Sequence, residues 1–157
     1  MSDDTAVHEA WMRQALALAA RAGESGEVPV GALVILDGVV VGEGWNQPIA
    51  TSDPTAHAEI VAMREAAAKL GNYRLVGCEL FVTLEPCAMC AGAMVLARID
   101  RCVYGCSDPK GGFMGTLGKL HAEPRLNHQF PVVGGVRSEE SGELLRSFFR
   151  RLRSRKG

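Results

Sequence analysis

The chain has 157 residues, of which 47% are hydrophobic and 22% charged, so it can bury the core of one ordinary domain, which we place over residues 1–157. Its acidic, polar amino-terminal segment does not resemble a signal peptide, and no apolar run approaches the roughly 20 residues of a transmembrane helix, so we expect a cytoplasmic protein with no membrane partner. The net charge of −1 conceals a basic carboxyl end: residues 146–157 hold six of the 17 basic side chains and no acidic one, which suggests an anionic partner unless the cations only stabilise a helix end.

The first predicted elements are a helix and a hairpin. Apolar side chains recur every three to four positions over residues 7–22, which predicts an amphipathic helix. Two apolar runs within residues 30–45 are joined at Asp37-Gly38, the pair typical of a type I′ turn, because both central residues of that turn need positive φ. An antiparallel pair of strands should therefore follow the helix.

Asp53 followed by Pro54 is typical of an N-cap with proline in the first helical turn, so we expect a helix from there to about Leu70, ending before Gly71. Single helices then separate the remaining strands, which requires crossover connections and a sheet covered on both faces. The pattern predicts an α/β fold, a three-layer α/β/α sandwich with a central mixed sheet of about five strands. The later elements are strands over 78–84, 101–106 and within 130–136, a helix beginning near Pro86, and a basic helix from about 138.

Cysteine spacing points to a metal. Cys87 and Cys90 form a C-x-x-C pair at a helix amino terminus, which favours the thiolate form that binds zinc. An all-sulfur site with Cys102 and Cys106 has a structural zinc spacing, but the apolar helix between the pairs should place Cys102 far from Cys87. A site completed by His57 leaves the fourth position open for water, as in a catalytic zinc, and collects its ligands at helix amino termini at one end of the sheet.

Glu59 lies two residues after His57, and residues two apart on a regular helix point about 200° apart, so we do not expect both to bind one ion. A zinc held by two thiolates and one imidazole is a weak Lewis acid whose water benefits from a nearby base. Glu59 is the candidate for that base, returning the proton to a ring nitrogen and a leaving amine. The plainer alternative is a first-turn glutamate that stabilises the helix dipole.

The segments HAE (57–59) and PCAMC (86–90) resemble the H-x-E and P-C-x-x-C signature of the zinc nucleobase deaminases. The chain resembles the bacterial tRNA-specific adenosine deaminases nearly end to end. The matching segments are EVPVGA, GEGWN, DPTAHAEI, NYRL, TLEPCAMCAGAM and FFR. The resemblance implies a cytidine-deaminase-like fold and the hydrolytic conversion of adenosine to inosine at the wobble position of tRNA. The zinc ion, one per subunit, would be bound by His57, Cys87 and Cys90, with Glu59 moving protons.

The resemblance also implies partners and substrate contacts. The partners would be the anticodon stem-loop of a tRNA, taken as an arginine tRNA, and a second copy of the chain in a homodimer. Asn46 would hydrogen-bond the base, and Asp108 would accept from a ribose hydroxyl. Phe149 and Arg150 would contact the RNA, whereas Phe148 belongs to an apolar stripe and should be core. Read alone, Asn46 is a turn residue and Asp108 a loop-stabilising one.

Two other functions remain open from the residues. The deaminase signature is shared by enzymes that act on free cytosine, guanine or deoxycytidylate, so it specifies the reaction more strongly than the substrate. A non-catalytic, zinc-stabilised RNA-binding module would also use a basic helix and a metal. An enzyme should lose turnover on changing Glu59, whereas a binding module should not. An RNA substrate should make binding depend on salt.

Overall fold

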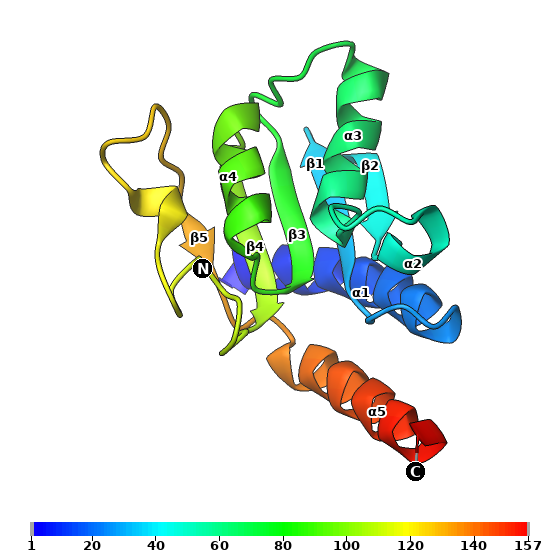
Figure 1. Ribbon diagram of the computed structural model, residues 1–157. Helices are drawn as coiled ribbons and strands as arrows, with labels where there is room; N and C mark the ends of the chain where they lie inside the picture. The colour runs from blue at the N-terminus through cyan, green and yellow to red at the C-terminus, as the bar shows by residue number, and fades with distance from the viewer. Residues whose placement is uncertain (1, 157) are drawn as a thin grey trace.

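The computed structural model describes residues 2–156, with the side chains of residues 4–155 (Figure 1). It has the predicted three-layer α/β/α arrangement around a mixed five-stranded sheet. The elements in chain order are α1 (Ser2–Glu24), β1 (Gly31–Leu36), β2 (Val39–Trp45), α2 (Pro48–Thr51), α3 (Ala58–Leu70), β3 (Glu79–Leu84), α4 (Ala88–Ala97), β4 (Arg101–Cys106), the short 3-10 helix η1 (Leu120–Ala122), β5 (Val132–Val133) and α5 (Ser138–Lys156).

The strands lie in the order β2-β1-β3-β4-β5. Strand β1 is antiparallel to both β2 and β3, while β3, β4 and β5 are parallel to one another. It follows that β1 runs against the other four strands, and that the carboxyl ends of β2, β3 and β4 share one edge of the sheet.

Both faces of the sheet are buried, and the strands alternate accordingly. In β1, Ala32 and Val34 belong to the core under α3 and α4, whereas Leu33 and Ile35 belong to the core under α1. In Figure 1, α3 and α4 stand in front of the sheet and α1 crosses behind it. This period-two burial on two sides is the physical basis of the three layers.

The predicted hairpin turn is confirmed. Asp37 has φ of 51° and Gly38 has φ of 75°, the two positive values that a type I′ turn needs. The predicted end of α3 is also confirmed, because Gly71 follows Leu70 as a left-handed C-cap with φ of 68°.

The start of that helix was predicted wrongly. Instead of capping a helix, the Asp53 carboxylate accepts hydrogen bonds from Thr55 N at 2.8 Å and Thr55 Oγ1 at 2.7 Å. This local turn leaves Pro54 outside any helix, and α3 begins only at Ala58. A short helix that the pattern did not predict, α2, precedes the turn and has proline in its first turn.

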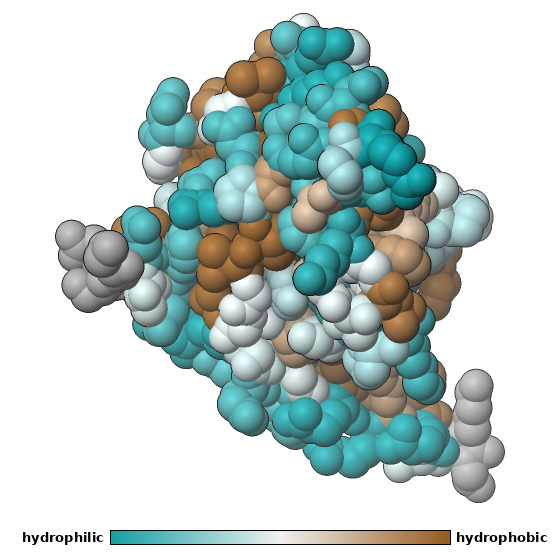
Figure 2. Space-filling view, turned by 90° about the vertical axis from the view of Figure 1, so that its left-hand side faces the viewer, coloured by the Kyte–Doolittle hydropathy of each residue, from teal (hydrophilic) through white to brown (hydrophobic). Residues whose placement is uncertain are grey.

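Helix α5 packs beside α1 and β4 at the bottom of Figure 1, and Phe148 on it is buried as expected. Hydrophilic side chains also predominate at the bottom of the molecule in Figure 2, which agrees with the basic composition of α5. The Lys156 side chain and Gly157 of the basic segment lie outside the described residues. None of the described helices is long and apolar enough to span a bilayer.

Candidate active site

Three side chains of the candidate site follow the carboxyl ends of three strands. Asn46 comes directly after β2, Glu85 directly after β3, and Asp108 two residues after β4. Because these strands point the same way, the three side chains meet at one edge of the sheet. They line a cavity of about 230 Å³ there, the region in which α/β proteins commonly hold ligands.

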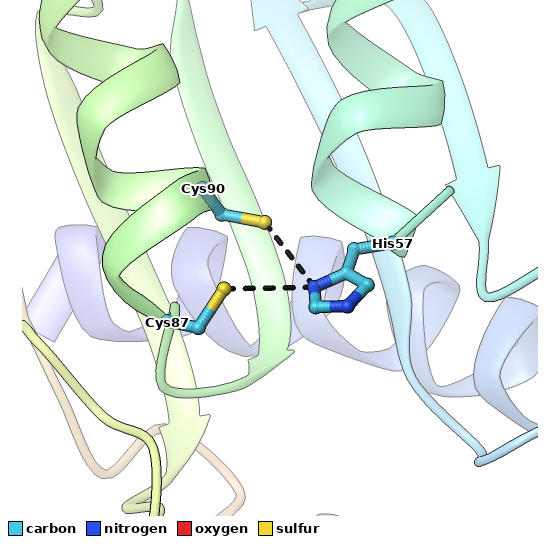
Figure 3. Close-up of side chains that lie close together, drawn as sticks. All are labelled: His57, Cys87 and Cys90. Atoms are coloured by element: carbon cyan, nitrogen blue, oxygen red, sulfur yellow. Dashed lines mark hydrogen bonds between the residues drawn. The ribbon is translucent and has the colours of Figure 1, made fainter. Parts of the chain in front are cut away.

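His57 and Cys87 each stand immediately before a helix. His57 is the N-cap of α3 and Cys87 the N-cap of α4, and neither side chain makes a capping hydrogen bond. For α3 that role falls to Asn46, whose Oδ1 accepts a hydrogen bond from the Ala58 N–H at 2.8 Å. The imidazole and the thiol are therefore left to face each other, with Cys90 from the first turn of α4 beside them (Figure 3).

The metal group consists of His57 Nδ1 and the Sγ atoms of Cys87 and Cys90, all within 4.8 Å of one another. Nδ1 lies 3.6 Å from the Cys87 sulfur and 3.5 Å from the Cys90 sulfur (Figure 3). A tetrahedral zinc with bonds of about 2.3 Å to sulfur and about 2.0 Å to nitrogen separates such atoms by about 3.5 Å. The group therefore fits zinc as it stands. No fourth ligand joins it among the described side chains, which is the open arrangement of a catalytic site.

Protons are shared unevenly among the three ligands when no metal binds them. Hydrogen bonds from Cys90 and His57 lower the pKa of Cys87 to about 4. The hydrogen bond between Cys90 and Cys87 raises the pKa of Cys90, so that thiol keeps its proton. The hydrogen bond between His57 and Cys87 raises the pKa of His57. Cys87 is thus a thiolate near neutral pH, and a binding cation displaces the protons that remain on the other two.

Glu59 and His57 line the same cavity, although two positions of one regular helix would point about 200° apart. That angle assumes one regular helix, but α3 begins at Ala58 and His57 has extended backbone. Glu59 is 4% exposed, and burial raises the pKa of its carboxyl to about 7. Its oxygens are not part of the metal group. A carboxyl of this kind can both accept and donate a proton near neutral pH.

The structure rules out the all-sulfur alternative. Cys102 pairs with Leu80 near the start of β3, whereas Cys87 follows the end of that strand. Cys106 pairs with Leu84, closer to the site, yet its sulfur does not join the metal group. Cys102 is fully buried, and burial holds the pKa of its thiol well above the ordinary value.

A wider groove of about 700 Å³ adjoins the metal cavity along α5. Val28, Leu84 and Asp108 line both spaces, so the two lie side by side. Phe149, which is 39% exposed, lies on the wall formed by α5. The basic side chains of the groove are Lys110, Arg146, Arg150 and Arg153. Cationic and aromatic side chains combined in one groove are typical of sites for single-stranded nucleic acids.

Asp108 and Arg150 both have partners within the chain. Asp108 Oδ1 accepts hydrogen bonds from Lys110 N at 3.0 Å and Gly111 N at 3.2 Å, so this residue does shape its loop. Arg150 donates to Glu143 Oε1 at 2.9 Å, and these side chains are 58% and 54% exposed. An ion pair this exposed contributes little, so a phosphate group can replace the carboxylate.

Glu85 also lies at the site, although the sequence pattern did not indicate it. It is 2% exposed and lines the metal cavity. Burial by itself would raise the pKa of Glu85, but hydrogen bonds from Thr116 and from the main-chain N–H groups of Asp108 and Met114 outweigh it, so the pKa lies below the ordinary value. The available signal was an acidic residue between the apolar strand FVTL and the metal-binding segment PCAMC.

Comparison with known proteins agrees with the geometry. Residues 5–106 match the family described as the cytidine and deoxycytidylate deaminase zinc-binding region. The chain is 47% identical to a tRNA-specific adenosine deaminase of Bacillus subtilis, over 94% of this chain and 92% of that one, and 48% identical to one of Haemophilus influenzae, over 94% and 86%. A solved structure from work on A-to-I editing by tRNA:A34 deaminases superposes with a TM-score of 0.83 at 46% identity, over 85% of this chain and 97% of that one.

The fold, the zinc-compatible ligand group and these matches define a zinc-dependent hydrolytic deaminase. More narrowly, the chain belongs to the cytidine and deoxycytidylate deaminase family, in the branch of the tRNA-specific adenosine deaminases.

Proposed function

We propose that the chain hydrolyses the adenine amine of the wobble adenosine in a tRNA anticodon loop, consuming one water and giving inosine and ammonia. The observation that carries the proposal is the adjacency of the metal cavity and a basic groove, since Asp108, Val28 and Leu84 line both. A free base would need only the cavity. A nucleotide flipped out of an RNA loop uses the cavity for its base and the groove for the flanking chain.

His57, Cys87 and Cys90 are the proposed zinc ligands. When bound, zinc supplies a Lewis acid that makes water nucleophilic near neutral pH. Glu59 is the proposed catalytic acid and base. Its buried carboxylate accepts a proton from the water and delivers it to a ring nitrogen of adenine. It then takes the second proton of that water from the new hydroxyl group on the ring carbon and transfers it to the amine, which leaves as ammonia. The raised pKa of Glu59 supports both directions of transfer.

Asn46 is the proposed base contact. Its Oδ1 is engaged by the Ala58 N–H, so the amide Nδ2 is the donor it can present to an acceptor on the ring. Because the same side chain anchors α3, the contact to the base is held in register with His57 and Glu59 at the start of that helix.

Asp108, Phe149 and Arg150 are the proposed RNA contacts. Asp108 Oδ2 makes no hydrogen bond with the described residues and is available to accept from a ribose 2′-hydroxyl, which would favour RNA over DNA. The exposed ring of Phe149 offers a stacking surface for a neighbouring base. Arg150 exchanges its exposed ion pair with Glu143 for a phosphate.

We further propose that the chain is one domain, acts in the cytoplasm on an arginine tRNA, and forms a homodimer. An apolar hollow of about 270 Å³ between α3 and α4 supports the dimer. Beside it Tyr73 is 68% and Leu96 is 69% exposed, as expected of side chains that a partner covers.

The test is the conversion of an unmodified anticodon stem-loop with adenosine at the wobble position, followed by digestion and mass spectrometry for inosine. Wild-type protein with one zinc per chain should make inosine at that position. Glu59→Gln should retain zinc and lose about 100-fold to 10,000-fold in rate. Glu65→Gln makes the same chemical change at an exposed position of α3 and should be fully active.

Two results would contradict the proposal. If the wild type fails on stem-loops and full-length tRNAs but deaminates free guanine, cytosine or deoxycytidylate, the substrate assignment is wrong. If Glu59→Gln is as active as Glu65→Gln, the assignment of Glu59 is wrong. A panel of tRNAs, including the arginine tRNA, tests the narrower partner.

A further inference from the structure

Both carboxylate oxygens of Glu85 bind one loop. Oε1 accepts hydrogen bonds from Asp108 N at 3.0 Å and Thr116 Oγ1 at 2.5 Å. Oε2 accepts from Met114 N at 3.0 Å and Thr116 N at 3.1 Å. All four donors lie in residues 108–116, hereafter the 108–116 loop. No ion pair of the described residues includes Glu85, so these donors are what stabilise its buried charge.

The loop lies directly on the carboxylate. A Cβ added to Gly112 would stand 2.3 Å from the Glu85 carboxyl carbon, so no larger residue fits there while Glu85 holds its position. Main-chain bonds continue the attachment on both sides. Phe113 N donates to Pro86 O at 2.9 Å, and Glu85 N donates to Cys106 O at 2.9 Å. Residues 85 and 86 thus bind the loop through side chain and backbone together.

This attachment joins the two parts of the site. Cys87, a proposed zinc ligand, follows Glu85 by two residues and continues the same turn into α4. At the other end of the hydrogen bonds, Asp108 and Lys110 form the wall of the groove. The position of the groove wall relative to the metal cavity therefore depends on Glu85.

We propose that Glu85 is a positioning residue for the substrate: it fixes the 108–116 loop against the metal-binding turn, and so sets the distance between the ribose contact at Asp108 and the reacting base. This inference rests on the proposed function. Glu85 is not part of the metal group, and its proposed effect on the substrate is exerted through Asp108.

Glu85→Gln is the central variant. Each carboxylate oxygen has two donors pointing at it, so either orientation of the new amide places its NH2 group against donors. Thr116→Val removes one side-chain donor and leaves the three main-chain bonds, and Thr116→Ser restores that donor. Glu123→Gln is the matched control, because this carboxylate binds Arg125 and does not line the groove.

Four quantities should be measured on the zinc-loaded protein: zinc per chain, hydrogen exchange at the amides of Asp108, Met114 and Thr116, and KM and kcat on the anticodon stem-loop. Glu85→Gln should keep its zinc, exchange faster at those amides, and raise KM about tenfold to a hundredfold with a much smaller change in kcat. Thr116→Val should raise KM less, Thr116→Ser should match the wild type, and Glu123→Gln should be unchanged.

Loss of zinc in Glu85→Gln would overturn the proposal, because the residue would then support the metal turn itself. A fall in kcat at unchanged KM, or unaltered exchange at the three amides, would overturn it as well. Wild-type protein that makes no inosine would refute the proposed function instead. In that case the affinity for a fluorescently labelled stem-loop, measured by anisotropy, should be compared between the wild type and Glu85→Gln. Weaker binding by the variant supports the positioning role, and equal binding refutes it.

Discussion

Asn46 caps the helix that His57 precedes: its side-chain oxygen accepts a hydrogen bond from the Ala58 N–H at 2.8 Å. The contact ties the end of β2 to the start of α3 and leaves the Asn46 amide nitrogen as the group that can donate to a base in the cavity. One side chain thereby supports the fold with its oxygen and keeps its nitrogen for the proposed contact with the substrate.

Two variants separate these roles of Asn46. Asn46→Asp keeps an acceptor for Ala58 and should retain zinc and thermal stability while KM for the stem-loop rises, because the donor is lost. Asn46→Ala loses both groups and should also lower the free energy of unfolding by about 1 kcal/mol. Denaturant melts and steady-state kinetics check this. An Asn46→Asp variant with normal KM would show that the amide nitrogen does not contact the base.

Thiol labelling should distinguish the proposed zinc ligands from the inert cysteines. In the zinc-free protein at pH 6, Cys87 should react with iodoacetamide, because hydrogen bonds lower its pKa to about 4 and it remains a thiolate there. Cys78 and Cys102 are fully buried with raised pKa values and should react only after denaturation. Peptide mass spectrometry gives the sites. Zinc should protect Cys87, and labelling that zinc does not change would contradict its role as a ligand.

Arg150→Ala should weaken stem-loop binding without lowering kcat at saturation, because this side chain lies in the groove and not in the metal cavity. Each phosphate contact to a single strand contributes about 0.7 to the slope of log K against log salt. The slope measured by fluorescence anisotropy should fall by that amount. Arg13→Ala, at an exposed position of α1, is the control and should leave the slope unchanged.

Gly44→Ala tests the contact between β2 and α3. A Cβ at Gly44 would lie 2.3 Å from the Ala58 carbonyl oxygen, a main-chain atom that cannot yield without moving the helix. We expect a loss of about 1–3 kcal/mol in the free energy of unfolding, together with lower zinc affinity. Gly142→Ala in α5 meets only the flexible end of Arg146 at 3.1 Å and should stabilise the protein by about 0.5–1 kcal/mol. Equal melts for the two variants would refute the close packing.

The parts of the fold predicted from the sequence are those that local chemistry determines. Asp37-Gly38 specifies its turn because both residues must adopt positive φ, and Gly71 ends α3 for a similar reason. Asp53 shows the limit of such rules. An aspartate before a proline is compatible with a helix cap and with a local turn. Here the hydrogen bonds from Thr55 to the Asp53 carboxylate stabilise the turn.

In the candidate site, too, some residues could be predicted from local chemistry and others could not. His57, Cys87 and Cys90 were predicted to come together because ligand chemistry and helix starts restrict them, and the structure places them in one group. Glu85 was missed because its partners lie 23 to 31 residues further along the chain, a pairing that no local pattern reveals. The orientation of Glu59 depended on where α3 begins, which is the least predictable property of a helix.

The metal-binding turn and the loop that forms the groove wall are attached to different strands, β3 and β4, and meet through Glu85 and the Pro86 carbonyl. The two can therefore diverge separately, and a change of substrate need not disturb the chemistry. A chimaera that receives residues 107–131 from another deaminase would assemble only if the donor segment brings its own partners for the Glu85 carboxylate. A graft that lacks them would leave a buried charge without compensation next to the proposed zinc ligands.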